Sequence, residues 1–579
     1  MLGIIEVSVA LIVCLLVAQF LKLQWTRRRF PPGPTPLPII GNLWLLDFKL
    51  HRENLVKLTN IYGNIYTVWM GQTPVIVLNG YKALKDGLIS HSEEISGRPL
   101  TPFYRDLMGE KEKRISFRKK ATNEELGDLL MASDQKAGAQ PLPDTTEAAE
   151  AIRMQKAASK LHLEHEQKLA DIRRLEKQKN AELEREATIR EERARRERIE
   201  RLTADERVRQ MQQETHQMQQ EMARPQLQVK KAMEEQLKLY PLGSPVYNNI
   251  GKSFDPHTHI VHAVANVICT VVFGHRFSSE DDSFNRLIKA IYFVIFFQAT
   301  IWGRMYDAFP WFMHHLPGPH QEVFVYTDFM HNLVKNEVRS HKERWKEDDP
   351  QDLIDFYLAQ IAKTKDDPTS TFNEDNMVQT VADLLLGGTE TTTITLCWAL
   401  LYMLQYPDIQ ERVQKELDTV LEPSQLIHYE DRKKLPYTNA VIHEILRCSN
   451  ITAVGSPRQC VKDTTVLGFP VEKGTIVLPN LHSAVYDSEH WETPWKFNPS
   501  HFLDSDGNFV NNEAFIPFSA GHRVCLGEQM ARTELFIFFV NLLRVFTFQL
   551  PEGVNEVNLN YILGAILQPH PYKLHVVPR

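Results

Sequence analysis

The chain contains 579 residues, with 66 Lys and Arg against 73 Asp and Glu, 43% hydrophobic residues, 26 Gly and 32 Pro. This composition is typical of globular proteins and excludes a fully disordered, collagen-like or multi-span membrane chain. The net charge of −7 gives no global argument for nucleic acid as a partner, and none is expected. The six cysteines lie far apart without a CxxC pair, so neither a disulfide framework nor a zinc site is indicated.

An apolar segment opens the chain. Residues 2–23 are mainly apolar, which is about the length needed to cross a bilayer as a helix. A cleaved signal peptide would require a basic start and a small-residue cleavage site, and the sequence offers neither clearly. Lys22 and the three arginines at 27–29 follow the apolar run, so the positive-inside rule predicts that the downstream chain faces the cytoplasm. We therefore expect residues 1–26 to form an uncleaved single-span anchor in membrane lipid.

Residues 27–42 form a basic and Pro-rich hinge. The run PPGPTPLP at 31–38 cannot continue a helix and favours a stiff, extended connector between anchor and body. Proline-rich segments also bind SH3-type domains, so a ligand for such a domain is the alternative to a spacer.

The remaining pattern predicts an α-rich α+β fold with small β-sheets. Residues 61–78 carry two runs of β-branched and aromatic residues separated by Gly71 and Gln72, which predicts a hairpin of short strands. After Gly251, long amphipathic or apolar runs predict helices, and residues 561–577 return to short strands. No GxGxxG or Walker-type motif indicates a nucleotide-binding fold.

Cys525 stands in the segment FSAGHRVCLG at 518–527. It follows a Gly-containing turn and precedes a helix predicted from Glu528 onward. A helix N-terminus and the neighbouring Arg523 both favour the thiolate, so the pKa of the Cys525 thiol is expected to be lowered. An anionic sulfur of this kind is a good ligand for an iron that requires strong electron donation. The alternative is a buried structural cysteine.

The spacing Phe-x-x-Gly-x-Arg-x-Cys-x-Gly in this segment resembles the haem-ligand signature of the cytochrome P450 family at every fixed position. The resemblance implies the cytochrome P450 fold, haem b (iron-protoporphyrin IX) as cofactor, Cys525 as the metal ligand and Phe518 as a residue beside the haem. The apolar N-terminus, the hinge and the segment Gly97-Arg98-Pro99 are similar to the vertebrate microsomal family-two enzymes. That similarity implies an endoplasmic reticulum membrane protein whose catalytic domain faces the cytoplasm.

Residues 382–392, ADLLLGGTETT, interrupt a long apolar helix with two glycines. Glycine within a helix costs about 1 kcal/mol relative to Ala, so Gly387 and Gly388 require an explanation. The resemblance implies that the helix bulges here over the haem, and that Glu390 and Thr391 are the catalytic residues that relay protons for the cleavage of dioxygen. A helix end with Thr caps is the alternative.

Glu444 and Arg447 share a helix face at i, i+3 and can pair. The resemblance adds His501, within the segment PSHF, as a third member at a position where most relatives have Arg. All three are expected to hold the scaffold of the haem loop and not to touch substrate.

Arg98, Arg458 and Arg523 are expected from the resemblance to contact the haem propionates, because guanidinium groups form forked pairs with carboxylates. Each also fits the alternative of an ordinary surface arginine. The residues expected to line the substrate pocket are mostly apolar, which suits a hydrophobic substrate without identifying one. They are Phe296, Phe297, Ala382, Gly387, Thr391, Thr452, Val454, Ile566 and Leu567.

Residues 111–245 depart from the family pattern. No Trp occurs between Trp69 and Trp302, so the Trp-x-x-x-Arg helix that donates to a haem propionate in the family is not recognisable. Of the 70 residues from 151 to 220, 31 are Asp, Glu, Lys or Arg, and the 81 residues from 144 to 224 contain neither Gly nor Pro. Such a segment predicts a long charged single helix, about 120 Å in length if continuous. A native insertion, an alternative exon and an error in the gene model fit this segment equally well.

Charge pairs support this predicted helix. Glu186–Arg190 and Glu197–Arg201 have the favourable i, i+4 order, and each such pair contributes roughly a few tenths of a kcal/mol. Apolar residues at 4-3 spacing from 204 to 222 give a weak seam for a partner helix, but they are too few for a sustained coiled coil. The basic run at 193–196 is interleaved with Glu, so a solvated face is favoured over nucleic acid or lipid headgroups.

The chain is thus expected to contain, after anchor and hinge, an N-terminal part of a haem domain at 43–110, the charged helical segment at 111–245 and the main part of the haem domain at 246–579. The leading interpretation is a haem-thiolate monooxygenase that inserts one oxygen atom of O2 into a lipophilic substrate such as a xenobiotic, fatty acid or steroid. Electrons would come from NADPH-cytochrome P450 reductase, with cytochrome b5 as a further partner.

Two other functions are alternatives to this one. An isomerase or lyase that uses the same haem without outside electrons is disfavoured because both Glu390 and Thr391 are present. A catalytically impaired, membrane-tethered protein whose long helix binds a partner is the second alternative. Because the propionate-binding helix is not recognisable, we expect weaker haem retention than in an ordinary relative.

Overall fold

A computed structural model describes residues 2–46, 52–99, 101–108, 250–297, 299–346, 349–368, 370–422 and 425–579. They belong to one of two compact units of the chain, Met1–Ser116 with Gln228–Arg579. The charged segment predicted at 111–245, with its helix and its seam, lies outside the described residues.

The N-terminal helix α1 (Leu2–Arg27) leaves most of its described apolar side chains exposed and is long and apolar enough to span a bilayer. Hydrogen bonds tie the first half of the hinge to the end of α1 and to the sheet. Arg27 donates from Nη2 to the carbonyl oxygen of Gly33 at 2.7 Å, and the backbone N–H of Thr67 donates to the carbonyl oxygen of Pro32 at 2.9 Å. A Cβ atom on Gly33 would lie 2.0 Å from the Thr67 carbonyl oxygen, so glycine permits this close approach of hinge and sheet.

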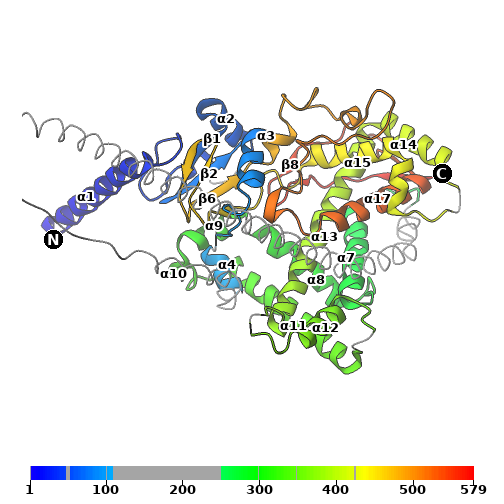
Figure 1. Ribbon diagram of the computed structural model, residues 1–579, viewed down its shortest axis with the longest axis horizontal. Coiled ribbons are helices and arrows are strands. Elements are labelled where there is room, and N and C mark those ends of the chain that lie inside the picture. The colour runs from blue at the N-terminus through cyan, green and yellow to red at the C-terminus, as the bar shows by residue number, and fades with distance from the viewer. Residues whose placement is uncertain are drawn as a thin grey trace, which may run out of the picture. The chain divides into compact units, whose positions relative to one another are not determined.

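The predicted hairpin is confirmed, and it forms one edge of a four-stranded sheet with the order β1-β2-β6-β3 (Figure 1). Strands β1 (Ile65–Met70) and β2 (Thr73–Leu78) are antiparallel, with Ile65 opposite Leu78. Strand β6 (Ile476–Pro479) runs parallel to β2, and β3 (Arg458–Gln459) is antiparallel to β6. The sheet therefore joins residues about four hundred positions apart in sequence.

Three two-stranded sheets complete the β-structure of the described residues. They pair β4 (Thr464–Val466) with β5 (Phe469–Val471), β7 (Phe546–Gln549) with β10 (His575–Pro578), and β8 (Tyr561–Ile562) with β9 (Gln568–Pro569). The expected return to short strands near the C-terminus is therefore confirmed.

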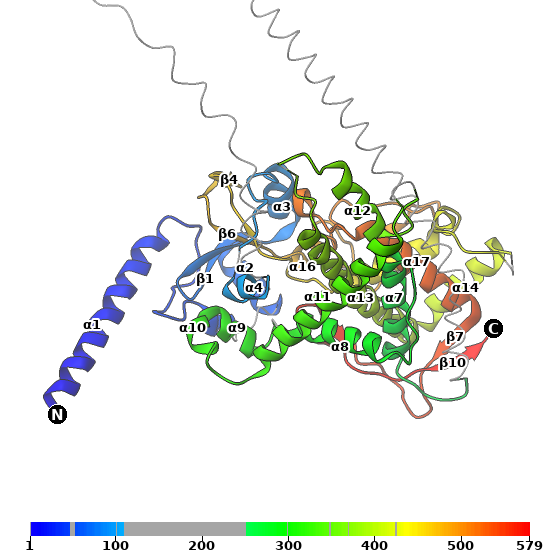
Figure 2. The ribbon, with the colours of Figure 1, turned by 90° about the horizontal axis from the view of Figure 1, so that it is seen from below.

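Helices make up the larger part of the body (Figures 1 and 2). The longer ones are α7 (His257–Phe273), α8 (Asp282–Phe297), α11 (Pro319–Arg344), α12 (Leu353–Lys363), α13 (Glu374–Gln405), α14 (Pro407–Val420), α15 (Pro436–Ser449) and α17 (Glu528–Val545). The shorter ones are α2 (Arg52–Tyr62), α3 (Gly80–Lys85), α4 (Pro102–Met108), α9 (Ile301–Ala308), α10 (Pro310–Met313) and α16 (His482–Val485).

Helix α13 is the central element, and α7, α8, α11, α15 and α17 all pack against it (Figures 1 and 2). It starts at the N-cap Asn373, whose side chain accepts a hydrogen bond from the N–H of Asn376, and it ends before Pro407. Its length and hydropathy would also suit a membrane span. However, 72% of its most apolar stretch is buried inside the protein, compared with 6% of the corresponding stretch of α1. We therefore assign α13 to the core and α1 to the membrane.

Candidate active site

The predicted turn and helix around Cys525 are confirmed. A short 3₁₀ turn (Gly521–Arg523) precedes the cysteine, and α17 begins at Glu528. The Cys525 backbone N–H donates to the Phe518 carbonyl oxygen at 3.0 Å, which closes the loop, and the thiol itself is exposed. The alternative of a buried structural cysteine is therefore wrong, since the fold leaves this thiol open to a ligand.

The expected lowering of the Cys525 pKa is wrong for the protein by itself. Partial burial of the thiol raises its pKa, and the nearby Glu528 carboxylate raises it further, while the backbone N–H groups of Gly527 and Glu528 lower it in part. Arg523, which the sequence placed beside the thiol, instead donates from Nε to the Ser96 carbonyl oxygen at 2.6 Å. A cation bound at the sulfur would reverse this balance, because a coordinating thiol loses its proton.

Aromatic and charged contacts made by Arg532 on α17 hold the Cys525 loop in place. The Arg532 guanidinium lies over the ring of Phe518 with its carbon 5.0 Å from the centroid, and it pairs with Glu528 one turn earlier at 2.9 Å. Its Nη1 also donates to Nε2 of His443 on α15 at 2.8 Å. Burial lowers the pKa of His443 to about 3, and the Arg532 charge contributes, so His443 stays neutral and accepts this bond. Arg532 on α17 therefore links the loop to α15.

Gly521 is required by the backbone of the loop. Its φ is +73°, and a Cβ atom there would lie 1.8 Å from the carbonyl oxygen of Leu88. Both the left-handed conformation and the close approach exclude a side chain at this position. The glycine of the signature thus seats the Cys525 loop against the segment that precedes Arg98.

The structure brings the three predicted arginines together. Arg98 is exposed and donates to the carbonyl oxygens of Ser456 at 3.3 Å and Pro457 at 3.1 Å. Arg458 is almost fully buried, and its Nη2 donates to Ser519 Oγ at 2.7 Å. Within the described part of the chain, no ion pair joins Arg98, Arg458 or Arg523 to a carboxylate.

This uncompensated positive charge indicates an anion site. The buried Nε and Nη1 atoms of Arg458 receive no acceptor from the described residues. Burial, together with the charges of Arg98 and Arg523, lowers the pKa of Arg458 to about 10. Burial and the Arg523 charge likewise lower the pKa of Arg98. A dianionic ligand would pair with these groups, so the residues present fit the two propionates of a haem.

The two central glycines of α13 serve different purposes. The helix is continuous through Gly387 and Gly388, so the expected bulge is not present in its backbone. A Cβ atom on Gly387 would meet no atom within 4 Å, whereas one on Gly388 would lie 2.7 Å from Cδ1 of Ile268 on α7. Gly388 therefore permits α7 to pack closely, and Gly387 leaves open space on one face of α13.

That open face continues along α13 by helical turns. Asp383 and Gly387 are exposed and Thr391 is half-buried, although the residues beside them are mostly buried. The Thr391 hydroxyl donates to the Gly387 carbonyl oxygen at 2.5 Å, so it lies on the same face. No hydrogen bond between described residues joins this face to the Cys525 loop, although α13 packs against α17. The alternative that Thr391 caps a helix end is wrong, because α13 continues to Gln405.

Glu390 is fully buried, and neither of its carboxylate oxygens accepts a hydrogen bond from the described residues. Its ion-pair partner is His257, the first residue of α7, with 3.9 Å between Nε2 and Oε2. The sequence did not indicate His257, because the pairing joins residues more than a hundred positions apart.

Glu534 on α17 is a second fully buried acid that the sequence did not indicate. Both of its carboxyl oxygens lack a hydrogen-bond partner among the described residues. Burial raises the pKa of Glu534 to about 8, and the nearby Thr392 hydroxyl lowers it in part. An acid nine residues after Cys525, within an otherwise apolar helix face, was the signal available in the sequence.

The predicted trio at 444, 447 and 501 is brought together. Arg447 and Glu444 are fully buried and form a two-bond pair, with Nε to Oε2 at 2.7 Å and Nη2 to Oε1 at 2.8 Å. His501 Nδ1 lies 3.3 Å from both Glu444 oxygens. The three side chains lie within the scaffold behind the loop, in agreement with a structural role.

The residues predicted to line a pocket fall into two groups. Phe297, Ala382, Ile566 and Leu567 are fully buried in the apolar core. The Leu567 backbone also holds the core, since its carbonyl oxygen accepts a 3.0 Å hydrogen bond from Trp398 Nε1. The others retain exposed surface: Phe296, Gly387, Thr391, Thr452 and Val454.

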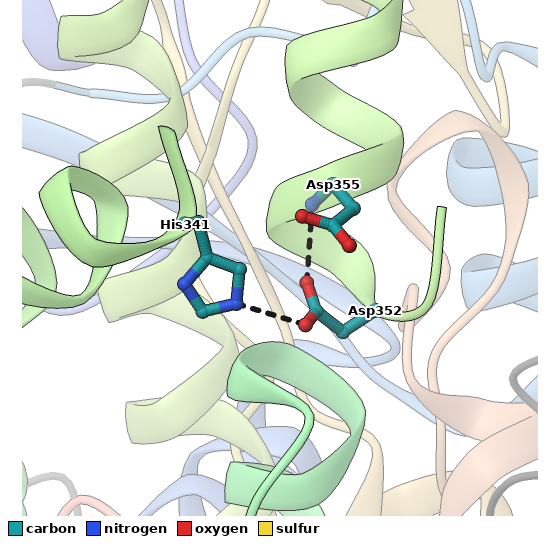
Figure 3. Close-up of side chains that lie close together, drawn as sticks. All are labelled: His341, Asp352 and Asp355. Carbon is teal, nitrogen blue, oxygen red and sulfur yellow. Dashed lines mark hydrogen bonds and ion pairs between the residues drawn. The ribbon is translucent and has the colours of Figure 1, made fainter. Parts of the chain in front are cut away.

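A separate cluster of titratable groups lies at the junction of α11 and α12 (Figure 3), where His341, Asp352 and Asp355 offer ligand atoms within 4.8 Å of one another. Both ring nitrogens of His341 are already used. Nδ1 lies 2.7 Å from the Glu337 carbonyl oxygen, and Nε2 lies 2.8 Å from Asp352 Oδ2. Burial lowers the pKa of His341, but the Asp352 carboxylate and the Glu337 carbonyl raise it overall. The cluster is therefore a buried ion pair and not a metal centre.

Comparison with known proteins identifies the family. A model of the family described as Cytochrome P450 matches residues 31–175 and 201–576. The chain belongs to the cytochrome P450 family. The match covers parts of the charged segment that the sequence motifs had not assigned to the family.

Several curated P450s are similar over nearly their whole length. Cytochrome P450 2J2 of Homo sapiens is 34% identical over 570 residues, which are 98% of this chain and 94% of that protein. Cytochrome P450 2F2 of Mus musculus is 34% identical over 554 residues, with 95% and 94% covered. Cytochrome P450 2D3 of Rattus norvegicus is 33% identical over 552 residues, with 95% and 93% covered.

The predicted fold, cofactor and activity are thereby confirmed at the level of the family. The protein is a haem-thiolate monooxygenase that acts on lipophilic substrates with O2 and redox partners. Its similarity to microsomal P450s and the apolar helix α1 indicate a protein anchored in the endoplasmic reticulum membrane.

Proposed function

We propose that the Cys525 thiolate would hold the haem iron, with Phe518 beside the haem, and that Arg98, Arg458 and Arg523 would hold the propionates. The observation that carries this assignment is the exposed Cys525 on a loop beside three arginines that have no carboxylate partner among the described residues: Arg523 in the loop itself, and Arg98 and Arg458 from other segments. When bound, the haem supplies the iron chemistry that activates O2. The roles of the protein are to ligate the iron, to neutralise the propionates and to keep the surroundings apolar.

The open face of α13 is the proposed binding surface for O2 and substrate. Gly387 leaves room beside the helix, and the Thr391 hydroxyl on that face can hold a proton or a water molecule. Glu390 supplies protons to Thr391 from its buried position next to it in sequence. Half-buried Phe296, Thr452 and Val454 make the pocket suited to a lipophilic molecule.

Electron supply and membrane orientation complete the proposal. The chain carries no flavin or nicotinamide motif, so NADPH-cytochrome P450 reductase is the proposed electron donor, with cytochrome b5 as a second one. The three arginines at 27–29, at the C-terminal end of α1, favour a single span with the body on the cytoplasmic side. The proposed domain limits, 1–26, 27–42, 43–110, 111–245 and 246–579, follow from this arrangement.

The test is the reduced carbon-monoxide difference spectrum of the full-length protein in membranes. We expect the Soret band of thiolate ligation from the wild type and from Cys14→Ser, and its loss in Cys525→Ser. Cys14 is the matched control because it is also exposed but lies in α1. A thiolate band that persists in Cys525→Ser would refute the ligand assignment. Transfer of haem to apomyoglobin would measure the predicted weak retention, which slow transfer would contradict.

A further inference from the structure

The surroundings of the Glu390 carboxyl group favour either a bound proton or a cationic partner. It is fully buried, and both of its oxygens lack hydrogen-bond donors in the described chain. An isolated buried carboxylate costs several kcal/mol, so it either binds a proton or pairs with a positive group. His257 is the cation in place, with Nε2 at 3.9 Å from Oε2.

His257 connects this buried acid with the outside of the protein. It occupies the first position of α7, and about one third of its side chain is exposed, against none of Glu390. Burial lowers the pKa of His257, but the charges of Glu390 and Asp255 raise it overall. The other titratable groups in this region are the buried Cys397 and Tyr572, whose burial keeps them neutral.

A histidine on the same helix provides the contrast. His259 lies two residues further along α7 and is also half-buried, but its ring contacts Phe254, with the centroids 5.4 Å apart. Burial and the nearby His262 lower its pKa. Asp255 raises the pKa of both histidines, so the contact with Glu390 is what distinguishes His257 from His259.

We propose that His257 is a positioning residue for the monooxygenase reaction, which holds the Glu390 carboxylate and passes protons to it from solvent at the start of α7. This inference rests on the proposed role of Glu390. In each transfer, the Nε2–H bond of the imidazolium breaks and an O–H bond forms on Glu390, while the neutral imidazole takes a new proton from solvent. No electrons move. The 3.9 Å gap is longer than a direct hydrogen bond, so in the proposed transfer a water molecule would relay the proton, taking the one from Nε2 and giving one of its own to Oε2.

The first test does not require turnover. Thermal unfolding of the full-length protein would be followed between pH 5 and 9 for wild type, His257→Gln, Glu390→Gln and the double variant, with His259→Gln as control. A histidine with a raised pKa stabilises the fold below that pKa, and the contribution is lost as the pH rises through it. His257→Gln should therefore lower the Tm more at pH 6 than at pH 9, and this difference should disappear in the Glu390→Gln background. An unchanged difference in that background would overturn the pairing.

The second test measures coupling in variants whose carbon-monoxide spectrum matches the wild type. We expect His257→Gln to lower product formed per NADPH consumed by about tenfold or more, with more peroxide released and a shifted pH profile, because proton supply to the site is interrupted. His259→Gln should behave like the wild type. Normal coupling and pH profile in His257→Gln would overturn the proton role. Absence of a thiolate band in the wild type would instead contradict the proposed function, and the unfolding test would still decide the pairing.

Discussion

Replacement of Arg447 by Lys should remove a large part of the stability of the body, because the guanidinium uses all five of its N–H groups. Nε and Nη2 donate to Glu444, Nη1 donates to the carbonyl oxygens of Val485 at 2.8 Å and Pro494 at 2.7 Å, and Nη2 also donates to that of Lys496 at 2.9 Å. Lysine keeps the charge but has three donors on a flexible stem and cannot form the two-bond pair.

The magnitude follows from the burial of both partners, whose side chains are 0% exposed. Breaking a buried pair costs about 3–5 kcal/mol, and each buried carbonyl left without a donor adds about 1–3 kcal/mol. Domains of ordinary stability unfold with about 5–15 kcal/mol, so Arg447→Lys should unfold the body or bring it close to unfolding. The unfolding entropy is near 2.1 cal/mol/K per residue, taken over roughly 400 residues. The roughly 3–5 kcal/mol lost with the buried pair alone therefore corresponds to a Tm about 4–6 °C lower.

The assay is thermal unfolding by circular dichroism, together with haem content. The matched control is Lys433→Ala, which breaks the Lys433–Glu430 pair of the same i, i+3 spacing and 2.9 Å length, with side chains 71% and 53% exposed. The stability lost in Lys433→Ala should be below about 1 kcal/mol. His501→Gln should cost about 1 kcal/mol, since its contacts to Glu444 are 3.3 Å long. Equal Tm values for Arg447→Lys and Lys433→Ala would refute the reasoning from burial.

Three further substitutions test the site. Gly387→Ala should raise stability by up to about 1 kcal/mol and lower turnover, because its Cβ atom would enter the open space beside α13. Gly388→Ala should be less stable than Gly387→Ala, because its Cβ atom would lie 2.7 Å from Ile268 Cδ1. Unfolding and turnover assays of the two variants decide this. Gly521→Ala should abolish haem incorporation, measured by absorbance, because its Cβ atom would meet the Leu88 carbonyl; normal incorporation would contradict the assigned loop geometry. Glu534→Gln should stabilise the fold increasingly from pH 4.5 to 8, because the folded acid keeps a proton over this range that the unfolded chain loses; a gain independent of pH would exclude this cause.

Local sequence patterns predicted those parts of the site that are built from neighbouring residues. The turn and helix around Cys525, the hairpin at 61–78 and the i, i+3 pair of Glu444 and Arg447 each depend on residues close together in the chain, and the structure confirms them. Short-range spacing is sufficient in such cases because turns, hairpins and helix faces have fixed periods.

The features that the sequence did not predict arise from contacts between distant segments. His257 meets Glu390 because α7 packs against α13, and no local motif records that packing. The error in the Cys525 pKa has the same origin, since burial by other segments outweighs the local N–H groups and Arg523 turns away to Ser96. The continuous backbone at Gly387 reflects the helices packed around α13, which keep its hydrogen-bond ladder intact.

The buried charged groups of this P450 are of two kinds: those whose polar atoms have partners within the protein, and those that retain atoms without one. Arg447 with Glu444 and His341 with Asp352 form closed pairs in which bonding atoms have partners, and such pairs serve the fold. Arg458 and Glu390 instead retain buried atoms without donors or acceptors among the described residues. Unsatisfied buried groups lower the stability of the fold, so a ligand or a function is the proposed reason for their presence. Under the proposed function, Arg458 would pair with a bound anion and Glu390 would take up a transferred proton. Glu534 is unsatisfied in the same way and has no proposed role in the reaction.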